Sequence, residues 1–255
     1  MLPERLSVSG TQISQVALDQ LLGALDRPPS GRARVVTFCN VHSVMTARQS
    51  GEVAAALDSS DIASPDGMPI AWWIRWVHRR SQLRVFGPGT MDAALRYGID
   101  RGWRHFMYGS TEQTLTQLTE NLEVTHPGVH VCGTYAPPFR PLTSDEHADA
   151  LDRIRAARPT IVWVGLGMPK QELWMRQVRE ELPGMTLAGV GAAFDMLAGR
   201  VPQAPPWMRT AGLEWLFRLS REPRRLWRRY TIHNPVFMFL LAREVVATRI
   251  QERRG

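Results

Sequence analysis

The segment Val164–Glu172, with the sequence VGLGMPKQE, carries the strongest chemical signal in the chain. An apolar run ends in Gly165 and Gly167 and passes directly into a helical pattern. Free backbone amides and the positive end of a helix dipole make such a turn a candidate phosphate site, although the glycines alone also suit a tight strand-to-helix turn. Three polar residues at the expected ligand-binding edge of a parallel sheet favour the functional interpretation: Lys170, Gln171 and Glu172.

Two aspartates are further candidates, each with a structural alternative. Asp66 lies in Ser64–Gly67 (SPDG), and Asp-Gly after a proline is most often a turn. A loop carboxylate at a sheet edge is also suited to act as a general base. Asp195 ends the segment Gly191–Asp195 (GAAFD) and is suited either to bind a ligand or to cap the following helix.

Several common chemistries lack the residues they need. The chain has no Asp-x-Asp pair, and its seven histidines do not have metal-ligand spacing, so we expect no metal and no other cofactor. A dinucleotide fingerprint fits poorly, because Lys170 stands at its third glycine position and no acid follows at the expected distance. Cys39 and Cys132 are too few for a disulfide framework or a four-thiolate metal site.

Positive charge is concentrated near the C-terminus. The 255 residues carry a formal net charge of +7. Residues 1–199 contain 19 basic and 20 acidic side chains, whereas residues 200–255 contain 12 basic and 4 acidic ones, a net charge of +8. We therefore expect any polyanionic partner to bind this last segment, whether nucleic acid, anionic lipid or phosphorylated substrate.

Arginines and aromatic residues are interleaved in the basic segment. Arg218 and Arg221 share one face of a predicted helix, as do Arg225 and either Arg228 or Arg229. Solvated arginines on helices docked against a core would produce this pattern. Three functional interpretations stand beside that one: arginines that clamp a diphosphate, a cationic aromatic face lying on an anionic membrane, and binding of single-stranded nucleic acid.

Short apolar runs alternate with segments of helical period before residue 200. The expected strands are Arg34–Phe38, Arg84–Phe86, His105–Tyr108, Val129–Cys132, Thr160–Val164 and Thr186–Val190. The expected helices lie near Val44–Leu57, Met91–Arg101, Glu112–Leu122, Asp145–Ala157 and Gln171–Glu180. This alternation favours an α/β fold of the Rossmann-like class, with a parallel sheet between helices. Thr143–Glu146 (TSDE) predicts a capping box at the start of its helix.

The pattern changes after Gly199. The segment Val201–Pro206 contains three prolines, which cannot continue a regular helix. Trp207–Ser220 and Arg224–Ile250 then have helical composition, and proline at the junction suits the first turn of the second helix. We therefore divide the chain into a core at residues 1–199 and a helical C-terminal appendage at residues 200–255.

Neither export nor membrane spanning is predicted. The sequence begins MLPERL, without the basic-then-apolar layout of a secretory signal. The most apolar stretch, Pro235–Ala242, is much shorter than the roughly 20 residues that span a bilayer. We expect a cytoplasmic protein.

Taken in order, these motifs resemble those of the WecG/TagA/CpsF family of bacterial glycosyltransferases, over roughly residues 30–240. The matching segments are Thr37–Asn40 (TFCN), Pro65–Gly67 (PDG), Arg84–Gly87 (RVFG), Tyr108–Ser110 (YGS), Pro137–Phe139 (PPF), Val164–Glu172, Gly191–Asp195 and Gly212–Arg225 (GLEWLFRLSREPRR). Each is weak alone, and their order makes the resemblance specific. One departure stands out: many members have an aspartate two positions after the glycine of RVFG, where this chain has Gly89.

The resemblance implies an inverting, metal-independent transfer of a sugar from a UDP-sugar to a polyprenyl-diphosphate-linked saccharide, for a cell-surface polysaccharide. Family donors include N-acetylmannosamine, uronic acids and hexoses. By position, Asp66 matches the general base, and Thr37 and Asn40 match the acceptor pocket. The nucleotide site would comprise Gly165, Gly167, Lys170, Gln171, Glu172, Asp195, Arg218, Arg221 and Arg225.

The resemblance also implies a place in the cell and excludes some partners. The appendage would close over the nucleotide and hold the protein on the inner face of the cell membrane, and self-association into a homo-oligomer is compatible with the sequence. No nucleic-acid partner is expected. The rival interpretations are a nucleic-acid-binding module built on the basic aromatic segment, and a nucleotide-sugar-modifying enzyme of dehydrogenase or epimerase type. A nucleic-acid module would leave the glycine turn and Asp66 without a function.

Overall fold

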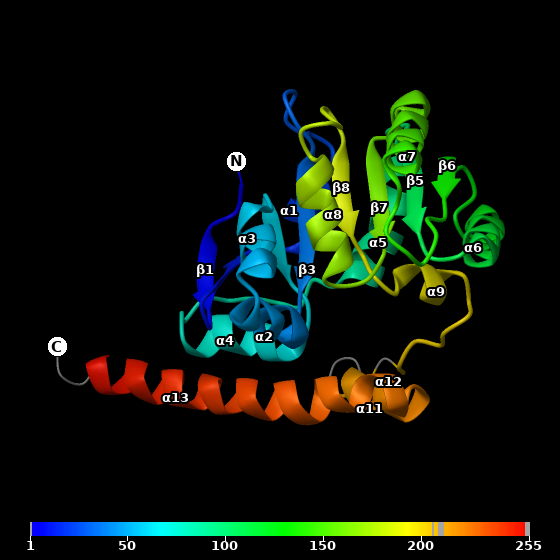
Figure 1. Ribbon diagram of the computed structural model, residues 1–255. Coiled ribbons are helices and arrows are strands. Elements are labelled where there is room, and N and C mark those ends of the chain that lie inside the picture. The colour runs from blue at the N-terminus through cyan, green and yellow to red at the C-terminus, as the bar shows by residue number, and fades with distance from the viewer. Residues whose placement is uncertain (1, 206, 209–211, 253–255) are drawn as a thin grey trace.

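The computed structural model describes residues 2–205, 207, 208 and 212–252. A six-stranded sheet with the order β4-β3-β8-β7-β5-β6 lies at the centre of these residues (Figure 1). Its strands are β3 (Arg34–Cys39), β4 (Ile62–Pro65), β5 (Arg104–Gly109), β6 (His130–Tyr135), β7 (Ile161–Gly165) and β8 (Thr186–Gly189). All neighbouring strands run parallel, which confirms the predicted α/β, Rossmann-like class.

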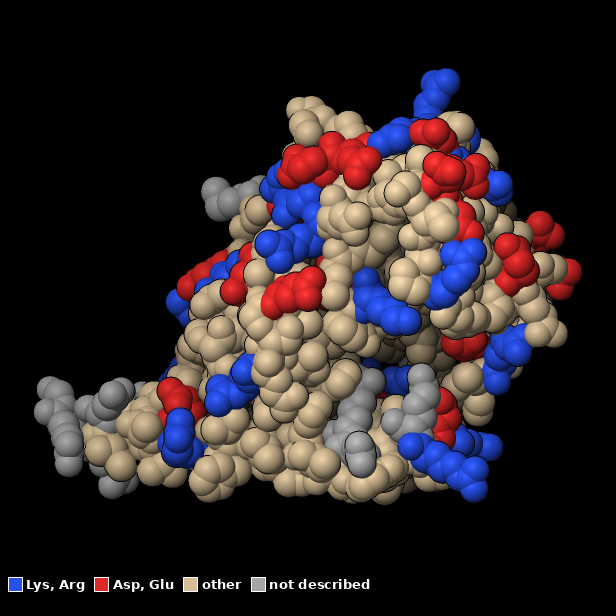
Figure 2. Space-filling model, in the orientation of Figure 1, with Lys and Arg blue, Asp and Glu red and all other residues tan. Residues whose placement is uncertain are grey.

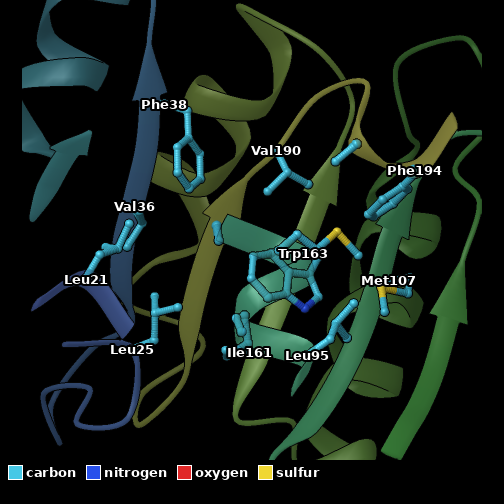
Figure 3. Close-up of a cluster of buried hydrophobic side chains, with 14 of the residues drawn as sticks. Leu21, Leu25, Val36, Phe38, Leu95, Met107, Ile161, Trp163, Val190 and Phe194 are labelled. Atoms are coloured by element: carbon cyan, nitrogen blue, oxygen red, sulfur yellow. The ribbon is translucent and has the colours of Figure 1, made fainter. Parts of the chain in front are cut away.

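Both faces of the sheet are buried, as the near-continuous apolar strands require. On β7, Ile161 and Trp163 enter one apolar cluster, and Val162 and Val164 enter the cluster on the opposite face. The first face is covered by α1 (Leu18–Leu25), α5 (Gly87–Ile99), α6 (Glu112–Thr125) and α9 (Ala193–Leu197). The second is covered by α7 (Ser144–Ala157) and α8 (Lys170–Val178). Figure 3 shows the Trp163 ring in the middle of the first cluster.

A third apolar cluster joins the appendage to the core. It contains side chains of α2 (Val41–Gln49), α3 (Gly51–Ser59), α4 (Met68–Trp76) and the hairpin of β1 (Arg5–Val8) and β2 (Thr11–Ser14). Phe237 and Leu241 of the last helix, α13 (Asn234–Glu252), are buried in the same cluster. In Figure 1 this helix runs beneath α2 and α4. The appendage is thus docked through apolar side chains.

The described residues 212–233 of the appendage form α11 (Glu214–Arg221), α12 (Pro223–Arg228) and a π-helical turn at Arg229–His233 before α13. Pro223 begins α12, as expected for a proline in a first helical turn. The range Arg224–Ile250, expected to be helical, is helical throughout, with the π-helical turn between α12 and α13. The division of the chain near residue 200 stays a prediction.

Two sequence-based elements differ from the structure. The expected strand Arg84–Phe86 is wrong: Val85 N–H donates to Pro65 O and its carbonyl accepts from Ser64 Oγ, without a repeating ladder. The expected helix Val44–Leu57 is two helices, because Ser50 has extended backbone and its Oγ accepts from Val53 N–H to cap α3.

The capping box predicted at the start of α7 is confirmed. Thr143 Oγ1 accepts a hydrogen bond from Glu146 N–H at 3.3 Å, and Glu146 Oε2 accepts one from Thr143 N–H at 2.9 Å. Each side chain satisfies a backbone donor that the first helical turn leaves unpaired. The local sequence therefore fixes where α7 begins.

Candidate active site

A cavity of about 270 Å³ opens at the carboxyl edge of the sheet. Loops after four strands line it, with Asn40 after β3, Asp66 after β4, Gly167 after β7 and Gly191 after β8. The appendage forms the facing wall with Glu214, Trp215, Arg218, Tyr230 and Asn234. Figure 2 shows a recess between the core and the end of the appendage that holds α11 and α12. The cavity therefore has one wall from each part of the chain, at the edge where parallel sheets bind ligands.

Asp66 is fixed at this edge by the backbone on both sides. Its N–H donates to Cys39 O at 2.9 Å, which ties the end of β4 to the end of β3. Gly67 follows with φ of +111°, a conformation that favours glycine, and leads into α4. The turn expected from the SPDG sequence is thus present, and it is this turn that holds Asp66 at the edge of the sheet.

One arginine links Asp66 to the appendage. Arg84 Nε and Nη2 both donate to Asp66 Oδ1 at 3.3 Å, and Arg84 Nη1 donates to Glu214 Oε2 at 2.6 Å. The three side chains are between 15% and 18% exposed, so the network is largely shielded from water. A charge-assisted contact between core and appendage therefore lies directly beside the candidate base.

Burial raises the pKa of the Asp66 carboxyl above its ordinary value. The positive charge of Arg84 opposes this effect, the negative charge of Glu214 adds to it, and the positive charge of Arg218 opposes it. A carboxylate with a raised pKa accepts a proton more readily, and general-base catalysis improves as the pKa approaches the working pH. The environment of Asp66 is suited to proton abstraction.

The side-chain amide of Gln171 joins two loops at the floor of the cavity. Its Oε1 accepts from the N–H groups of Gly167 at 3.2 Å and Gly191 at 3.1 Å. Its Nε2 donates to Gly189 O and to Glu172 Oε1, both at 2.9 Å. Because the Gly167 N–H is bonded to Gln171, the glycine turn serves here as a scaffold that holds the loops after β7 and β8 together.

Glu172 is a buried acid in the cavity wall. Glu172 is 2% exposed, and burial raises the pKa of its carboxyl to about 7. Gln171 donates to Oε1, whereas Oε2 has no hydrogen-bond partner among the described residues. Near neutral pH this position thus holds a carboxyl that is partly protonated, which is able to donate as well as accept a hydrogen bond.

Asn40 and His42 connect the end of β3 to the cavity and to the appendage. Asn40 Oδ1 accepts from Ser43 N–H at 3.2 Å and so caps α2. His42 Nδ1 lies 3.2 Å from His233 Nδ1, and the two rings stack with centroids 5.3 Å apart. The first turn of α2 therefore contacts the π-helical turn of the appendage.

The cavity wall brings together six of the residues proposed from the sequence: Asn40, Asp66, Gly167, Gln171, Glu172 and Arg218. Thr37 lies behind it in β3, with Oγ1 next to Cys39 Sγ and Ser60 Oγ. Gly165 lies outside the lining and packs against Phe194, whose ring would be 2.6 Å from an added Cβ. Its requirement for glycine is therefore explained by packing.

Three further proposed residues, Lys170, Asp195 and Arg221, are also placed outside the lining. Lys170 is exposed at the start of α8, and Asp195 lies in α9. Arg221 is exposed, with its guanidinium 5.4 Å from the centre of the Phe217 ring. Arg225 belongs to α12, and its side chain lies outside the described residues. Among the appendage arginines whose side chains are described, Arg218 is the one that lines the cavity.

Arg84 and Glu214 are functional candidates that sequence reasoning did not single out. Each lies inside a segment that carries the family resemblance, which was the available signal. Their contact joins residues 130 positions apart, so no local pattern predicts it. Only the docking of α11 on the core shows that these charges meet.

Two features are absent from the described residues. No group of three or more histidine, cysteine, aspartate or glutamate side chains within that part of the chain is arranged to hold a metal ion. None of the helices described is both long enough and apolar enough to cross a membrane. The expected independence from metals stays a prediction.

Comparisons with known proteins agree on one family. The family model described as "Glycosyl transferase WecG/TagA/CpsF family" matches residues 6–251. A relative from Bacillus spizizenii is 29% identical over 183 residues, which cover 72% of this chain and 69% of the relative. That relative is named N-acetylglucosaminyldiphosphoundecaprenol N-acetyl-beta-D-mannosaminyltransferase. The family match includes both walls of the cavity.

Proposed function

The chain belongs to the WecG/TagA/CpsF family of glycosyltransferases, and from this premise we propose the reaction that it catalyses. It transfers a sugar from a UDP-sugar to a polyprenyl-diphosphate-linked saccharide, with inversion at the anomeric carbon and without a metal. The product serves cell-surface polysaccharide synthesis. The observation that carries the proposal is Asp66, a largely shielded carboxyl with a raised pKa, in a cavity whose two walls both lie within the family match.

Asp66 is the general base in this proposal. It takes the proton from the attacking acceptor hydroxyl while the acceptor oxygen forms its bond to the anomeric carbon. The bond from that carbon to the diphosphate oxygen breaks on the opposite side, and UDP leaves with the electron pair. A single in-line displacement of this kind inverts the configuration. A positioned base typically contributes about 100- to 10,000-fold in rate.

Two arginines are placed to stabilise the leaving diphosphate. Arg218 lines the cavity and its Nε has no hydrogen-bond partner among the described residues, which leaves that donor for a ligand. Arg84 also lines the cavity and is held between Asp66 and Glu214. Guanidinium groups bind phosphate oxygens well because they present planar, paired donors. Preorganised positive charge where negative charge develops then supplies the stabilisation that a metal gives in other enzymes.

On the acceptor side we assign Asn40 to direct contact. Asn40 lines the cavity near Asp66, whereas Thr37 is 1% exposed in β3. Thr37 would therefore support the acceptor pocket from behind, through the position of β3. The glycine turn, with Gly167 bonded to Gln171, shapes the donor side.

The appendage is also proposed to hold the enzyme on the inner face of the cell membrane. Its exposed side chains include Trp215, Trp227, Ile232, Phe239 and Val246. Figure 2 shows a mostly uncharged surface along α13, with basic side chains gathered at the end formed by α11 and α12. Apolar and aromatic side chains beside positive charge are typical of helices that lie in a membrane interface. An enzyme that uses a lipid-linked acceptor would gain access to it in this way.

A donor and acceptor screen tests the proposed reaction. The full chain is mixed with UDP-N-acetylmannosamine, its uronic acid, UDP-glucuronic acid or neutral UDP-hexoses, and with a short-chain lipid diphosphate that bears N-acetylglucosamine. The relative's name makes the first donor and this acceptor the pair to try first. We expect UDP release that needs both substrates, survives EDTA and gives a product whose new linkage is inverted by NMR. A retained linkage, or activity lost to EDTA and restored by magnesium, would contradict the mechanism.

A further inference from the structure

A second cavity, of about 290 Å³, lies between the N-terminal hairpin, α4 and α13. Its lining includes Arg48, Trp73, His78, Arg243 and Glu244. No residue of this cavity belongs to the lining of the candidate active site. In Figure 1 the part of α13 that borders it runs beneath β1 and α4, away from the end that holds α11 and α12. The proposed transfer reaction gives this cavity no function.

Two of its basic side chains are held in place by the hairpin. Arg48 Nη1 donates to the carbonyl of Ser9 at 3.2 Å and to its Oγ at 3.0 Å. His78 Nε2 donates to Ser7 O at 2.7 Å, because a carbonyl oxygen only accepts. These contacts use uncharged partners, so they fix the side chains without neutralising a positive charge. Among the described residues, the remaining guanidinium donors of Arg48 have no hydrogen-bond acceptor that would compete with a ligand.

Trp73 contributes a donor that the described residues leave unpaired. It is 4% exposed, and its ring lies 5.4 Å from that of Phe237. Nε1 is buried and has no hydrogen-bond partner among the residues described. A buried donor without an acceptor costs free energy, and Trp N–H groups usually find a partner when buried. An acceptor bound in the cavity that Trp73 lines would remove this cost.

The charge of the cavity favours an anion. Arg48 and Arg243 form no ion pair with any carboxylate in the described part of the chain, and Glu244 is the acid in the lining. The two guanidinium groups outweigh that single negative charge. Guanidinium and indole N–H donors around a space of this size match an oxyanion with several acceptor oxygens.

We propose that this cavity binds a phosphate group. Arg48 and Arg243 contact its oxygens, and Trp73 Nε1 donates to one of them. The group belongs either to a lipid headgroup or to a phosphate free in solution. The exposed apolar side chains of Val236, Phe239 and Val246 on the same helix would suit the acyl region beside a headgroup. The site would then fix the orientation of α13 on the surface that carries the phosphate.

Calorimetric titration of the full chain with inorganic phosphate tests the site, at constant ionic strength because surface charge is screened by salt. Arg243→Ala removes a ligand, and Arg249→Ala is the matched control, since it removes the same charge from an exposed position on the same helix outside the lining. A charge-assisted hydrogen bond corresponds to about 10-fold in affinity or more. We expect that loss for Arg243→Ala, wild-type affinity for Arg249→Ala, and tighter binding for Glu244→Gln.

Flotation with phosphatidylglycerol vesicles then distinguishes the two sources. A larger loss of vesicle binding for Arg243→Ala than for Arg249→Ala indicates a lipid headgroup. Equal vesicle binding by the two variants, together with the difference in phosphate titration, indicates a free phosphate. If the two variants match in both assays, the proposal is wrong. It is also wrong if wild type binds neither inorganic phosphate nor the phosphatidylglycerol vesicles. UDP release with a short-chain acceptor is measured in parallel, because neither variant changes the candidate active site.

Discussion

The two walls of the active-site cavity are built in different ways. The core wall places Asp66 directly after β4 and places Gln171 and Glu172 in the first turn of α8, where hydrogen bonds and shielding from water restrict them. The appendage wall places Glu214 and Arg218 on α11, a helix in which no described residue is buried. It meets the core site through the Glu214–Arg84 contact and through the docked helix α13.

The difference separates two tasks. Groups whose protonation matters lie in the core, because burial shifts a pKa and a rigid sheet edge keeps that burial constant. In the proposed reaction Arg218 of the appendage meets the anionic substrate together with Arg84 of the core, and Arg218 Nε has no hydrogen-bond partner among the described residues. Substitutions in the core wall should therefore change turnover or stability, and those in the appendage wall should change binding and pH dependence.

The largest effect is expected from Asp66→Asn. Asparagine keeps the shape of the side chain but cannot accept the proton, so kcat should fall by about 100- to 10,000-fold. Steady-state UDP release with the lipid-linked acceptor measures this loss, and calorimetric titration with UDP should give an affinity close to that of wild type. A variant with near-normal kcat would remove Asp66 from the role of base.

Glu172→Gln tests the buried acid through stability. The pKa of Glu172 is about 7 in the folded chain and 4.5 as its ordinary value. At pH values between 4.5 and about 7 the folded state binds more protons than the unfolded state. The free energy of unfolding therefore falls as the pH rises, by about 3 kcal/mol in total. Urea unfolding at pH 5 and pH 8 should show most of this loss in wild type.

In Glu172→Gln the part of the pH dependence that comes from this group should disappear. Glu123→Gln, at an exposed position on α6, controls for the removal of one carboxylate. Equal pH dependence in wild type and Glu172→Gln would mean that Glu172 is ionised in the folded protein over the whole range.

Arg218→Ala should weaken UDP binding by about 10- to 100-fold, the range expected for charge-assisted hydrogen bonds. Arg221→Ala is the matched control on the same helix, because the structure places Arg221 outside the cavity lining. The measurement is UDP titration in detergent without lipid, so that membrane attachment does not contribute. Equal losses for both variants would show that α11 acts through its total charge rather than through one positioned arginine.

The smallest effect is expected from Glu214→Gln. The negative charge of Glu214 raises the pKa of Asp66, and its loss also leaves Arg84 free to pair more fully with Asp66. Both changes lower that pKa, so the acidic limb of the kcat/KM profile should move to lower pH, by less than about 1 unit. An unchanged limb, measured between pH 4 and pH 8, would show that the appendage does not tune the base.

The sequence predicted the parallel sheet because its strands are short apolar runs between helical patterns, and this signal is local. It did not predict β4, since Ile62–Pro65 is short and merges with the turn at Asp66. It also assigned strand structure to Arg84–Phe86, where β-favouring residues extend beside β4 without a ladder. Whether such short segments become strands depends on pairing with a distant segment, which a local sequence pattern does not predict.

For the site, the order of motifs in the sequence identified Asp66, Asn40, Gln171, Glu172 and Arg218 as candidates. The structure places all five in the lining of the cavity. The motif order also included Thr37, Gly165, Lys170, Asp195 and Arg221, which lie near those motifs in the chain but outside the lining. Neighbouring residues on a strand or helix point in different directions, so a motif identifies the segment and not the side chain that reaches the cavity.

The sequence by itself determined the family, the fold class, the segregation of charge into the appendage and the identity of the candidate base. These properties depend on residue type, order and local period. The tertiary structure alone decided that Arg84 joins Asp66 to Glu214, that Gln171 ties together the loops after β7 and β8, and that Glu172 is buried. Hydrogen bonding and desolvation depend on distances of a few ångströms between residues far apart in the chain, and those distances exist only after folding.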